Sequence, residues 1–596
     1  NFTNQDEFIF NKYEFTRDLE FNNRIVKFDK NYYLHLKLKI PTTKSNRKHS
    51  IILLDTSGSM GQLAKLKNSS GIEEDQGLSL LKVSIHAIKT LLSSFEDGDF
   101  ISIITFDDTS EIIENLIEFN KNEKVRIFNK LDSIQVRGST NLENGLEECY
   151  KICSAYPDLF NTVILFTDGR PNSCRSTWDR ILDNYERTYN IFPKIDAIGF
   201  SNNIDVDSLK LISSHSNGTY CFIPDSGMIS DIMINYSARY KNMIINKNCV
   251  EFNIKLPKHF EFDNKLIYGV DEINLFDDNI INLKTGSLIS DQEKNILIPI
   301  TLTGEDSSKE FENKVTININ DVIITKKDKL ILEDYDISNE VIRYNFLNLL
   351  NFIQKQAKRT QYDICRTEII KFLNEYDMYS DNLIIKDLEG QVLESVSNAE
   401  YWNNWGYKYV VSLYFAHNNE YCNNYKDFGV QKYTTSEFEN LREIYSEMFN
   451  KIPPPKPDVR ISNSTSSTSS HRSSVDMSSF NNRGGVCFTG DNLVYLKFEN
   501  EIYKDKIENL KKDDLVAINY DEDGEFIFDK IQCIIKTDFI KYDNSKTYIC
   551  KIPIDQQNNN KFLKISPLHP IIKDNKWIHP KDLVKPILTE CNYVYS

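Results

Sequence analysis

The sequence predicts a multidomain protein: a doubly wound α/β domain, an antiparallel β-sandwich, a helical region and a C-terminal all-β domain. Three observations lead to this prediction. At 596 residues the chain is several times the size of an ordinary domain, so several cores are expected. Between residues 50 and 240 short apolar runs alternate with helical periodicity. After residue 250 the pattern changes first to strand-like alternation and then to helical spacing.

The α/β domain is predicted over residues 48–242. Buried parallel strands are expected at 51–54, 100–106, 162–166 and 195–200, where β-rich apolar runs stand between polar stretches. Helices are expected at 78–95, 124–131, 142–153 and 206–213, where apolar residues recur at helical spacing. A helix at about 225–240 closes the domain. This alternation is that of a Rossmann-like, doubly wound sheet.

The β-sandwich is predicted over residues 243–335. Apolar and polar residues alternate there between Asn, Asp and Gly turns, as at 316–324. The N-terminal segment 1–47 also contains an alternating stretch at 32–40, which ends at Pro41. We expect this stretch to add a strand to the sandwich.

The helical region is predicted over residues 336–457. Helices are expected at 340–358, 368–376, around Trp402 and Trp405, and at 436–449, where Ser436 and Glu439 have capping-box spacing. Prolines at 453–457 stop helical structure. A Ser-rich linker follows at 458–485, and its residues 462–480 have almost nothing to bury, which predicts flexibility. Short β-rich runs resume over 486–596.

Charge and composition exclude several classes of function. Lysine plus arginine number 71 against 87 aspartate plus glutamate, a net charge of −16, which disfavours nucleic acid and anionic membranes as partners. No apolar run approaches the roughly 18 residues of a membrane span. The 11 cysteines form no C-x-x-C pair, which argues against a zinc ribbon and favours reduced thiols and an intracellular location.

A metal site is predicted at the carboxyl edge of the parallel sheet. The first strand runs directly into Asp55, Ser57 and Ser59. Thr140 precedes a predicted helix, and Asp168 follows a predicted strand. Ligands of open α/β sheets bind at this edge. Hydroxyls and two carboxylates are hard oxygen donors that suit Mg²⁺, or Mn²⁺, and their low charge leaves the ion able to accept an acidic side chain of a protein ligand.

These five residues resemble the metal-ion-dependent adhesion site (MIDAS) of von Willebrand factor A domains. The resemblance covers about residues 48–242 and implies that the hydroxyls of Ser57, Ser59 and Thr140 coordinate directly. Asp55 and Asp168 would act largely through water. One departure is the long polar insertion at 61–77, which is expected to screen or reshape the ligand face.

A second site is predicted where the terminal domain begins, at Cys487. A cysteine there can attack the preceding carbonyl and convert the Val486–Cys487 amide into a thioester. The leaving nitrogen needs a proton, which a histidine can supply, and the carbonyl oxygen needs a polarising hydroxyl or amide. Ser566 and His569 stand in a later Ser-x-x-His run and are the candidates for these roles.

Cys487, Ser566 and His569 resemble the active site of Hint modules of hedgehog and intein type, with Ser566 in place of the family's threonine. The segments around Trp405 and at 426–431, with the triple proline, are similar to the Vwaint region, which accompanies A domains and the Vint type of Hint domain. Since related modules continue into further strands, we expect the part over 486–596 to be C-terminally incomplete.

Two functional classes remain open: a metal-dependent binding scaffold with an inert Hint domain, and a protein that cleaves itself at Val486–Cys487. A structural scaffold without metal is disfavoured because it leaves five ordered oxygen ligands unexplained. No enzyme activity on other molecules is predicted. The triplet Asp427-Phe428-Gly429 is found in kinases, but neither a glycine-rich loop nor a His-Arg-Asp segment accompanies it.

Overall fold

The structure, a computed structural model, forms two compact units, residues 1–482 and 483–596. It describes residues 19–42, 47–67, 73–169, 177–201, 203–224, 226–244, 250–256, 260–263, 266–303, 310–319, 322–331, 336–380, 382–457, 477–480, 488–489, 491–498, 501–511, 514–520, 526–531, 536–538, 546–553, 562–565, 571–573, 576–578, 587–590 and 593–595.

The α/β domain is built on a six-stranded sheet of order β10-β9-β8-β3-β6-β7. Its strands are β3 (His49–Asp55), β6 (Phe100–Phe106), β7 (Ser110–Glu118), β8 (Asn161–Thr167), β9 (Lys194–Phe200) and β10 (Tyr220–Ile223). β3 is parallel to both β6 and β8, and β7 alone runs antiparallel to its neighbour. The predicted doubly wound fold is confirmed. After β3 the chain adds β6 and β7 on one side of that strand and then β8, β9 and β10 on the other side, so the topological switch point lies between β3 and β8.

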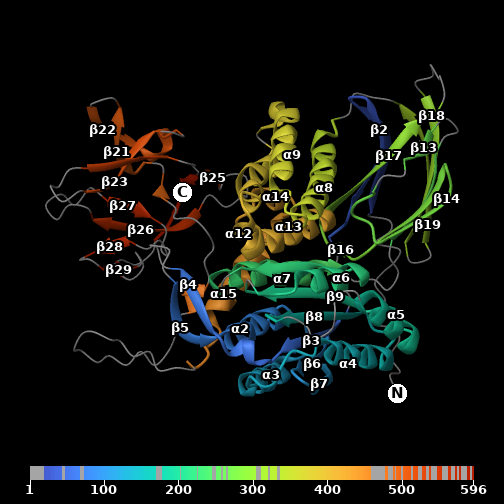
Figure 1. Cartoon of the computed structure of the whole chain (residues 1–596), viewed down its shortest axis with the longest axis horizontal. Helices are drawn as coiled ribbons and strands as arrows, with labels where there is room; N and C mark the ends of the chain where they lie inside the picture. The colour runs from blue at the N-terminus through green and yellow to red at the C-terminus, as the bar shows by residue number, and fades with distance from the viewer. Residues whose placement is uncertain are drawn as a thin grey trace. The chain divides into compact units, whose positions relative to one another are not determined.

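Helices cover both faces of this sheet (Figure 1). They are α2 (Leu80–Leu92), α3 (Lys121–Ser133), α4 (Leu142–Ala155), α5 (Trp178–Tyr189), α6 (Val206–His215) and α7 (Ile229–Asn242). The sequence did not predict α5, β7 or β10. The polar insertion at 61–77 contains a hairpin of β4 (Leu63–Lys67) and β5 (Glu73–Ser79), after the 3-10 turn η1 (Gly58–Gly61).

Two antiparallel sheets form the sandwich. One has the order β1-β2-β17-β13 and the other β14-β15-β12-β18-β19. N-terminal strands β1 (Glu20–Phe28) and β2 (Asn31–Lys39) join β17 (Glu293–Leu302) and β13 (Phe260–Phe262). The other sheet contains β12 (Val250–Lys255), β14 (Glu272–Asp277), β15 (Ile280–Thr285), β18 (Glu310–Ile319) and β19 (Val322–Ile331). Of the predicted alternating stretch, residues 316–319 lie in β18 and residues 322–324 lie in β19, and these two strands pair with each other.

The helical region consists mainly of α8 (Ser338–Ala357), α9 (Tyr362–Glu375), α13 (Tyr407–Asn419) and α15 (Ser436–Lys451). Shorter helices α10 (Leu383–Asp387) and α14 (Phe428–Gln431) lie between them in the chain. The predicted capping position is wrong by one residue: Thr435 caps α15, and its hydroxyl accepts the Phe438 amide at 3.2 Å, whereas Ser436 is the first helical residue. None of the described helices has the length and apolar character of a membrane span.

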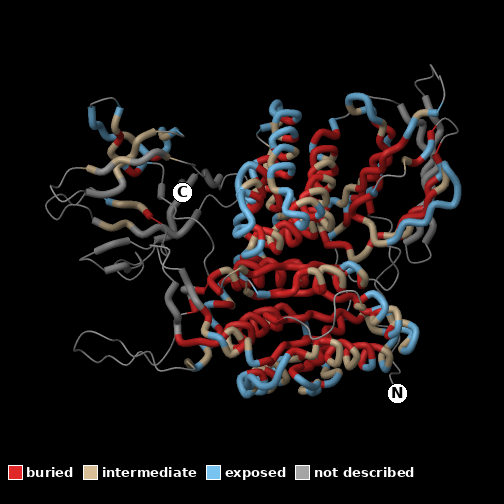
Figure 2. The backbone as a smooth tube through the Cα atoms, in the orientation of Figure 1, coloured by how far each residue is buried: buried red, intermediate tan, exposed pale blue. Residues whose placement is uncertain are grey.

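The α/β domain and the helical region share one hydrophobic core (Figure 2). Apolar residues of α2 and α7 belong to the same cluster as those of α8, α13 and α15. The end of the predicted linker also joins this core. Residues 477–480 form the 3-10 turn η7 (Met477–Phe480), in which Met477 and Phe480 are buried, so this part differs from the predicted flexible segment.

The second unit is all-β, as the sequence predicted. Its main sheet has the order β25-β31-β20-β27-β26-β30. A further sheet has the order β22-β21-β23-β24 and consists of β21 (Leu493–Phe498), β22 (Glu501–Lys506), β23 (Leu515–Tyr520) and β24 (Phe526–Lys530). In the main sheet β20 (Phe488–Thr489) lies between β27 (Phe562–Ile565) and β31 (Tyr593–Tyr595). The other strands of this sheet are β25 (Lys536–Asp538), β26 (Lys546–Pro553) and β30 (Ile587–Glu590).

Candidate metal centre

The loop after β3 folds back on the last residue of the strand. Asp55 is fully buried, and its Oδ1 accepts the Ser57 backbone amide at 2.8 Å. In the following turn the Gly58 amide donates to the Gly138 carbonyl at 3.1 Å. The loop that carries Ser57 and Ser59 is therefore tied to the segment just before Thr140.

Asp168 directly follows β8, the neighbour of β3, and meets this loop. The Ser59 hydroxyl donates to Asp168 Oδ1 at 2.8 Å. The hydroxyl oxygens of Ser57 and Ser59 lie 3.1 Å apart. Hence the Asp168 carboxylate, at the end of β8, and the Ser57 and Ser59 hydroxyls, in the loop after the neighbouring strand β3, form one cluster.

Thr140 lies against the same cluster, as the space at Gly169 shows. A Cβ at Gly169 would lie 2.9 Å from Thr140 Oγ1 and 3.3 Å from Asp55 Oδ2. Only the missing side chain of Gly169 lets the backbone pass beside both oxygens. The structure thus brings together all five residues predicted for the metal site.

Two further residues of the site escaped the sequence argument. The Thr167 hydroxyl donates to Asp55 Oδ2 at 2.5 Å and accepts the Gly169 amide at 3.1 Å, so it orients the buried carboxylate. Gly138 has φ of +56°, and a Cβ there would lie 2.6 Å from Asp108 Oδ2. Their positions in the sequence could have indicated both residues: Thr167 directly precedes Asp168, and Gly138 directly precedes Ser139.

The electrostatics of the cluster favour a cation. Burial raises the pKa of Asp55, against hydrogen bonds from Ser57 and Thr167. Burial also raises the pKa of Asp168 to about 6, and the nearby Asp55 adds to this while the Ser59 hydroxyl opposes it. Two carboxylates in a site with little water are costly when ionised, and a bound divalent ion would stabilise their charged form. The donors are oxygens only, so the set fits Mg²⁺ or Mn²⁺.

The predicted self-processing residues Cys487, Ser566 and His569, together with Val486, lie outside the described residues. Their flanking residues are described. Phe488, which follows Cys487, pairs with Ile565, which precedes Ser566. The strands β20 and β27 therefore join the two chain segments that carry the predicted residues.

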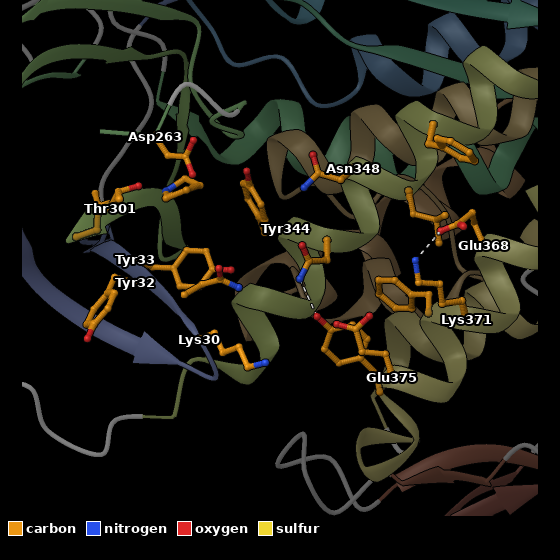
Figure 3. A pocket seen from close by; sticks show the side chains of 18 of the residues that line it. Lys30, Tyr32, Tyr33, Asp263, Thr301, Tyr344, Asn348, Glu368, Lys371 and Glu375 are labelled. Carbon is orange, nitrogen blue, oxygen red and sulfur yellow. Dashed lines mark hydrogen bonds and ion pairs between the residues drawn. The ribbon is translucent and has the colours of Figure 1, made fainter. Parts of the chain in front are cut away.

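A cavity of about 790 Å³ lies elsewhere in the first unit, between the sandwich and the helical region (Figure 3). Tyr32 and Tyr33 of β2 and Tyr344 of α8 contribute aromatic rings to it. The charged pair Glu368 and Lys371 comes from α9, with 3.4 Å between nitrogen and oxygen. None of the five residues of the metal cluster lines this cavity, so it is a separate feature.

Three family models match the chain in sequence. The model described as von Willebrand factor type A domain matches residues 50–170. The model described as VWA / Hh protein intein-like, or Vwaint, matches residues 378–447. The Hint-domain model, Vint, matches residues 486–596. No curated protein matches the chain.

Two solved structures are similar to part of the chain at low sequence identity. A von Willebrand factor type A protein from Catenulispora acidiphila is 13% identical, with a TM-score of 0.48 over 67% of this chain and 96% of that chain. The ArnB paralog VWA2 from Sulfolobus acidocaldarius is 15% identical, with a TM-score of 0.41 over 67% of this chain and 98% of that chain.

Proposed function

Because the chain carries a von Willebrand factor type A domain, a Vwaint region and a Hint domain of the Vint type, we propose that it binds an acidic protein ligand through a divalent cation and processes itself at Cys487. The A domain makes it a protein-interaction module, and the Hint domain is intein-like. The observation that carries the metal-dependent part is the convergence of Asp55, Ser57, Ser59, Thr140 and Asp168 at one edge of the sheet.

In this proposal the three hydroxyls supply neutral oxygens and the two carboxylates supply charge. Ser57, Ser59 and Thr140 would hold the ion. Asp55 and Asp168 each accept a hydroxyl hydrogen bond, from Thr167 and Ser59 respectively, and these bonds tie the carboxyl end of β3 to that of β8. When bound, Mg²⁺ or Mn²⁺ would supply an electrophilic position that a carboxylate of the partner would occupy.

Isothermal titration calorimetry of Mg²⁺ into the full chain tests the site. We expect one binding event that Asp168→Ala abolishes, because this change removes a buried charge and the acceptor of Ser59. The exposed Asp97 of the same domain provides the control, and Asp97→Ala should bind Mg²⁺ like the wild type. Equal Mg²⁺ binding by the wild type and Asp168→Ala would show that the site is assigned to the wrong residues.

The self-processing step is an N-to-S acyl shift. The Cys487 sulfur bonds to the Val486 carbonyl carbon, the carbon–nitrogen bond breaks, and the thiol proton ends on the freed amine. His569 would deliver the proton to the leaving nitrogen, and the Ser566 hydroxyl would polarise the carbonyl oxygen. The support is the family match over 486–596 and the Phe488–Ile565 pairing that joins the two segments.

Hydroxylamine at neutral pH tests this step, since thioesters react with it far faster than amides. Mass spectrometry of the full chain should then find a fragment that ends at Val486. Cys487→Ala should stop its release, His569→Ala should slow it by about 10²- to 10⁴-fold, and Cys550→Ser should leave it unchanged. A chain that stays whole under this treatment favours the second function, a binding scaffold with an inert Hint domain, for which Ser566 in place of threonine is the supporting feature.

A further inference from the structure

One flank of α5 carries three carboxylates that the proposed function does not use. Asp179, Asp183 and Glu186 recur at i, i+4 and i+7, which places them on one side of the helix. Trp178, Leu182 and Tyr185 are buried on the core side of α5. The acidic flank is therefore held in place by a rigid, packed helix.

His215, at the C-terminal end of α6, meets this flank. Its Nε2 lies 3.2 Å from Glu186 Oε1 and 3.8 Å from Asp183 Oδ1. The ligand atoms of these three residues all lie within 4.8 Å of one another. The side chains of His215 and Glu186 are only 17% and 16% exposed, whereas that of Asp183 is 47% exposed. The cluster is thus half-buried and open to solvent on one side.

These distances are close to those of a zinc site. Zinc bound at about 2.0–2.2 Å in a tetrahedron separates its ligand atoms by about 3.3 Å. The two distances from Nε2 bracket this value, and the carboxylate oxygens of Asp183 and Glu186 lie within 4.8 Å of each other, so side-chain rotations would bring the three ligand atoms to zinc-binding separations. We propose that Asp183, Glu186 and His215 form a second metal site, which takes Zn²⁺ with one position left for water or a partner group.

Asp179 would act as a positioning residue for this site. The other imidazole nitrogen of His215, Nδ1, lies 3.7 Å from Asp179 Oδ1, an ion-pair distance that a small side-chain rotation would shorten to a hydrogen bond. A carboxylate on that nitrogen orients the ring and keeps Nε2 free of its proton for the metal. The arrangement of carboxylate, imidazole and metal recurs in zinc proteins.

The imidazole distinguishes this site from the oxygen cluster at Asp55. Nitrogen donors favour Zn²⁺, whereas hydroxyls and carboxylates favour Mg²⁺. The two sites share no residue. The alternative use of the cluster is an ion-pair network, in which a protonated His215 is balanced by the carboxylates without any metal.

Titration of Zn²⁺ into the full chain against a chromophoric chelator, with millimolar Mg²⁺ present, separates these possibilities. The bound zinc should fall by one ion per chain in His215→Ala and in Glu186→Gln. Glu148→Gln, on the neighbouring helix α4, and Asp168→Ala should keep the wild-type number. Asp179→Asn should keep the ion but weaken its binding by about 10- to 100-fold.

Anomalous scattering at the zinc edge from crystals of the wild-type chain provides a measurement that does not depend on a variant folding. The expected result is a peak bonded to Glu186 and His215. An unchanged zinc number in Glu186→Gln, or zinc-soaked crystals with no peak between α5 and α6, would overturn the proposal and leave an ion-pair network only.

Discussion

At the scale of single residues, Gly169 is the most sensitive point of the metal cluster. A methyl group there would approach Thr140 Oγ1 and Cγ2 at 2.9 and 3.1 Å, closer than Cβ atoms normally come. Gly169→Ala should therefore push the Thr140 hydroxyl away and weaken Mg²⁺ binding by at least tenfold, while the secondary structure stays intact. Isothermal titration calorimetry measures the Mg²⁺ affinity, and circular dichroism measures the secondary structure.

Gly58 provides the matched control for that substitution. It lies in the same cluster of loops, but its Cβ would meet only the Gly138 carbonyl, at an ordinary 3.6 Å. Gly58→Ala should keep Mg²⁺ affinity within about threefold of the wild type. Equal affinities of the Gly169→Ala variant and the wild type would mean that Thr140 does not contribute to the site.

His86 makes the stability of the first unit depend on pH. Its Nε2–H donates to the Phe449 carbonyl at 2.8 Å, while its buried Nδ1 has no partner among the described atoms. Burial lowers its pKa to about 4, and Lys89 contributes to this. The neutral ring is favoured in the folded state, so unfolding takes up a proton between pH 6.5 and 4. This contribution to stability is complete above pH 6.5 and is lost as pH falls.

The prediction is tested with His86→Phe, which keeps the ring contact with Phe449 but cannot titrate. Other buried groups also titrate, so the informative quantity is the difference in the free energy of unfolding between the wild type and the variant. When the pH is lowered from 7.5 to 5, the free energy of unfolding of the wild type should fall by about 2 kcal/mol more than that of the variant. This figure follows from about 1.4 kcal/mol per unit of pKa shift. Urea unfolding at both pH values measures it, and a constant difference would contradict the neutral buried ring.

At the scale of elements, a buried carboxylate explains the kinase-like triplet. Asp387, at the end of α10, accepts the backbone amides of Phe428 at 2.7 Å and of Gly429 at 2.8 Å. These amides open α14 and have no partner within it. A Cβ at Gly429 would lie 2.6 Å from Asp387 Oδ2, so the glycine lets the carboxylate approach. The triplet therefore has a structural role: it lets the Asp387 carboxylate of α10 bind the N-terminus of α14.

Asp387→Ala should remove this interaction between α10 and α14. It leaves the buried Gly429 amide and the partly buried Phe428 amide without this acceptor, and the free energy of unfolding should fall by about 2–4 kcal/mol. Glu389, an exposed carboxylate two residues later, serves as the control, and Glu389→Ala should stay within about 0.5 kcal/mol of the wild type. Urea unfolding of both variants checks the prediction. Equal losses would show that the carboxylate of Asp387 has no special role.

The turn η7 anchors the chain just before the second unit. Met477 and Phe480 are 3% and 0% exposed, and both belong to the main core of the first unit. Phe480→Ala should detach this turn, so its amides should lose hydrogen-exchange protection while α7 and α15 keep theirs. Exchange in η7 as slow in the variant as in the wild type would mean that Phe480 does not hold it.

At the scale of the whole molecule, the shared core predicts how the chain unfolds. The apolar residues of α7 pack with those of α15, and the Asp231 carboxylate of α7 accepts the Tyr425 amide of the helical region at 2.6 Å. The A domain and the helical region should therefore unfold together. Differential scanning calorimetry should show two unfolding transitions, one for each unit. Asp387→Ala should lower the transition temperature of the first unit only. A separate transition of the A domain would contradict the shared core.

The sequence predicted those features that depend on periodicity and strand order. The strands β3 and β8 were recognisable as apolar runs, and parallel strands meet at one edge, which was enough to group Asp55, Ser59 and Asp168. What the sequence did not predict depends on contacts between distant segments. Asp387 reaches amides 41 and 42 residues away, and η7 is too short to show any periodicity. Thr435 and Ser436 are both good capping residues, and only the backbone distinguishes them.

We propose that Asp55, Ser57, Ser59, Thr140 and Asp168 together hold a divalent cation. Anomalous diffraction from crystals of the full chain grown with Mn²⁺ tests it most directly, because the ion scatters anomalously and replaces Mg²⁺ at oxygen sites. We expect an anomalous peak within about 2.5 Å of the Ser57, Ser59 and Thr140 hydroxyl oxygens, and no such peak in crystals of Asp168→Ala. Well-ordered β3 and β8 loops without a peak at saturating Mn²⁺ would contradict it.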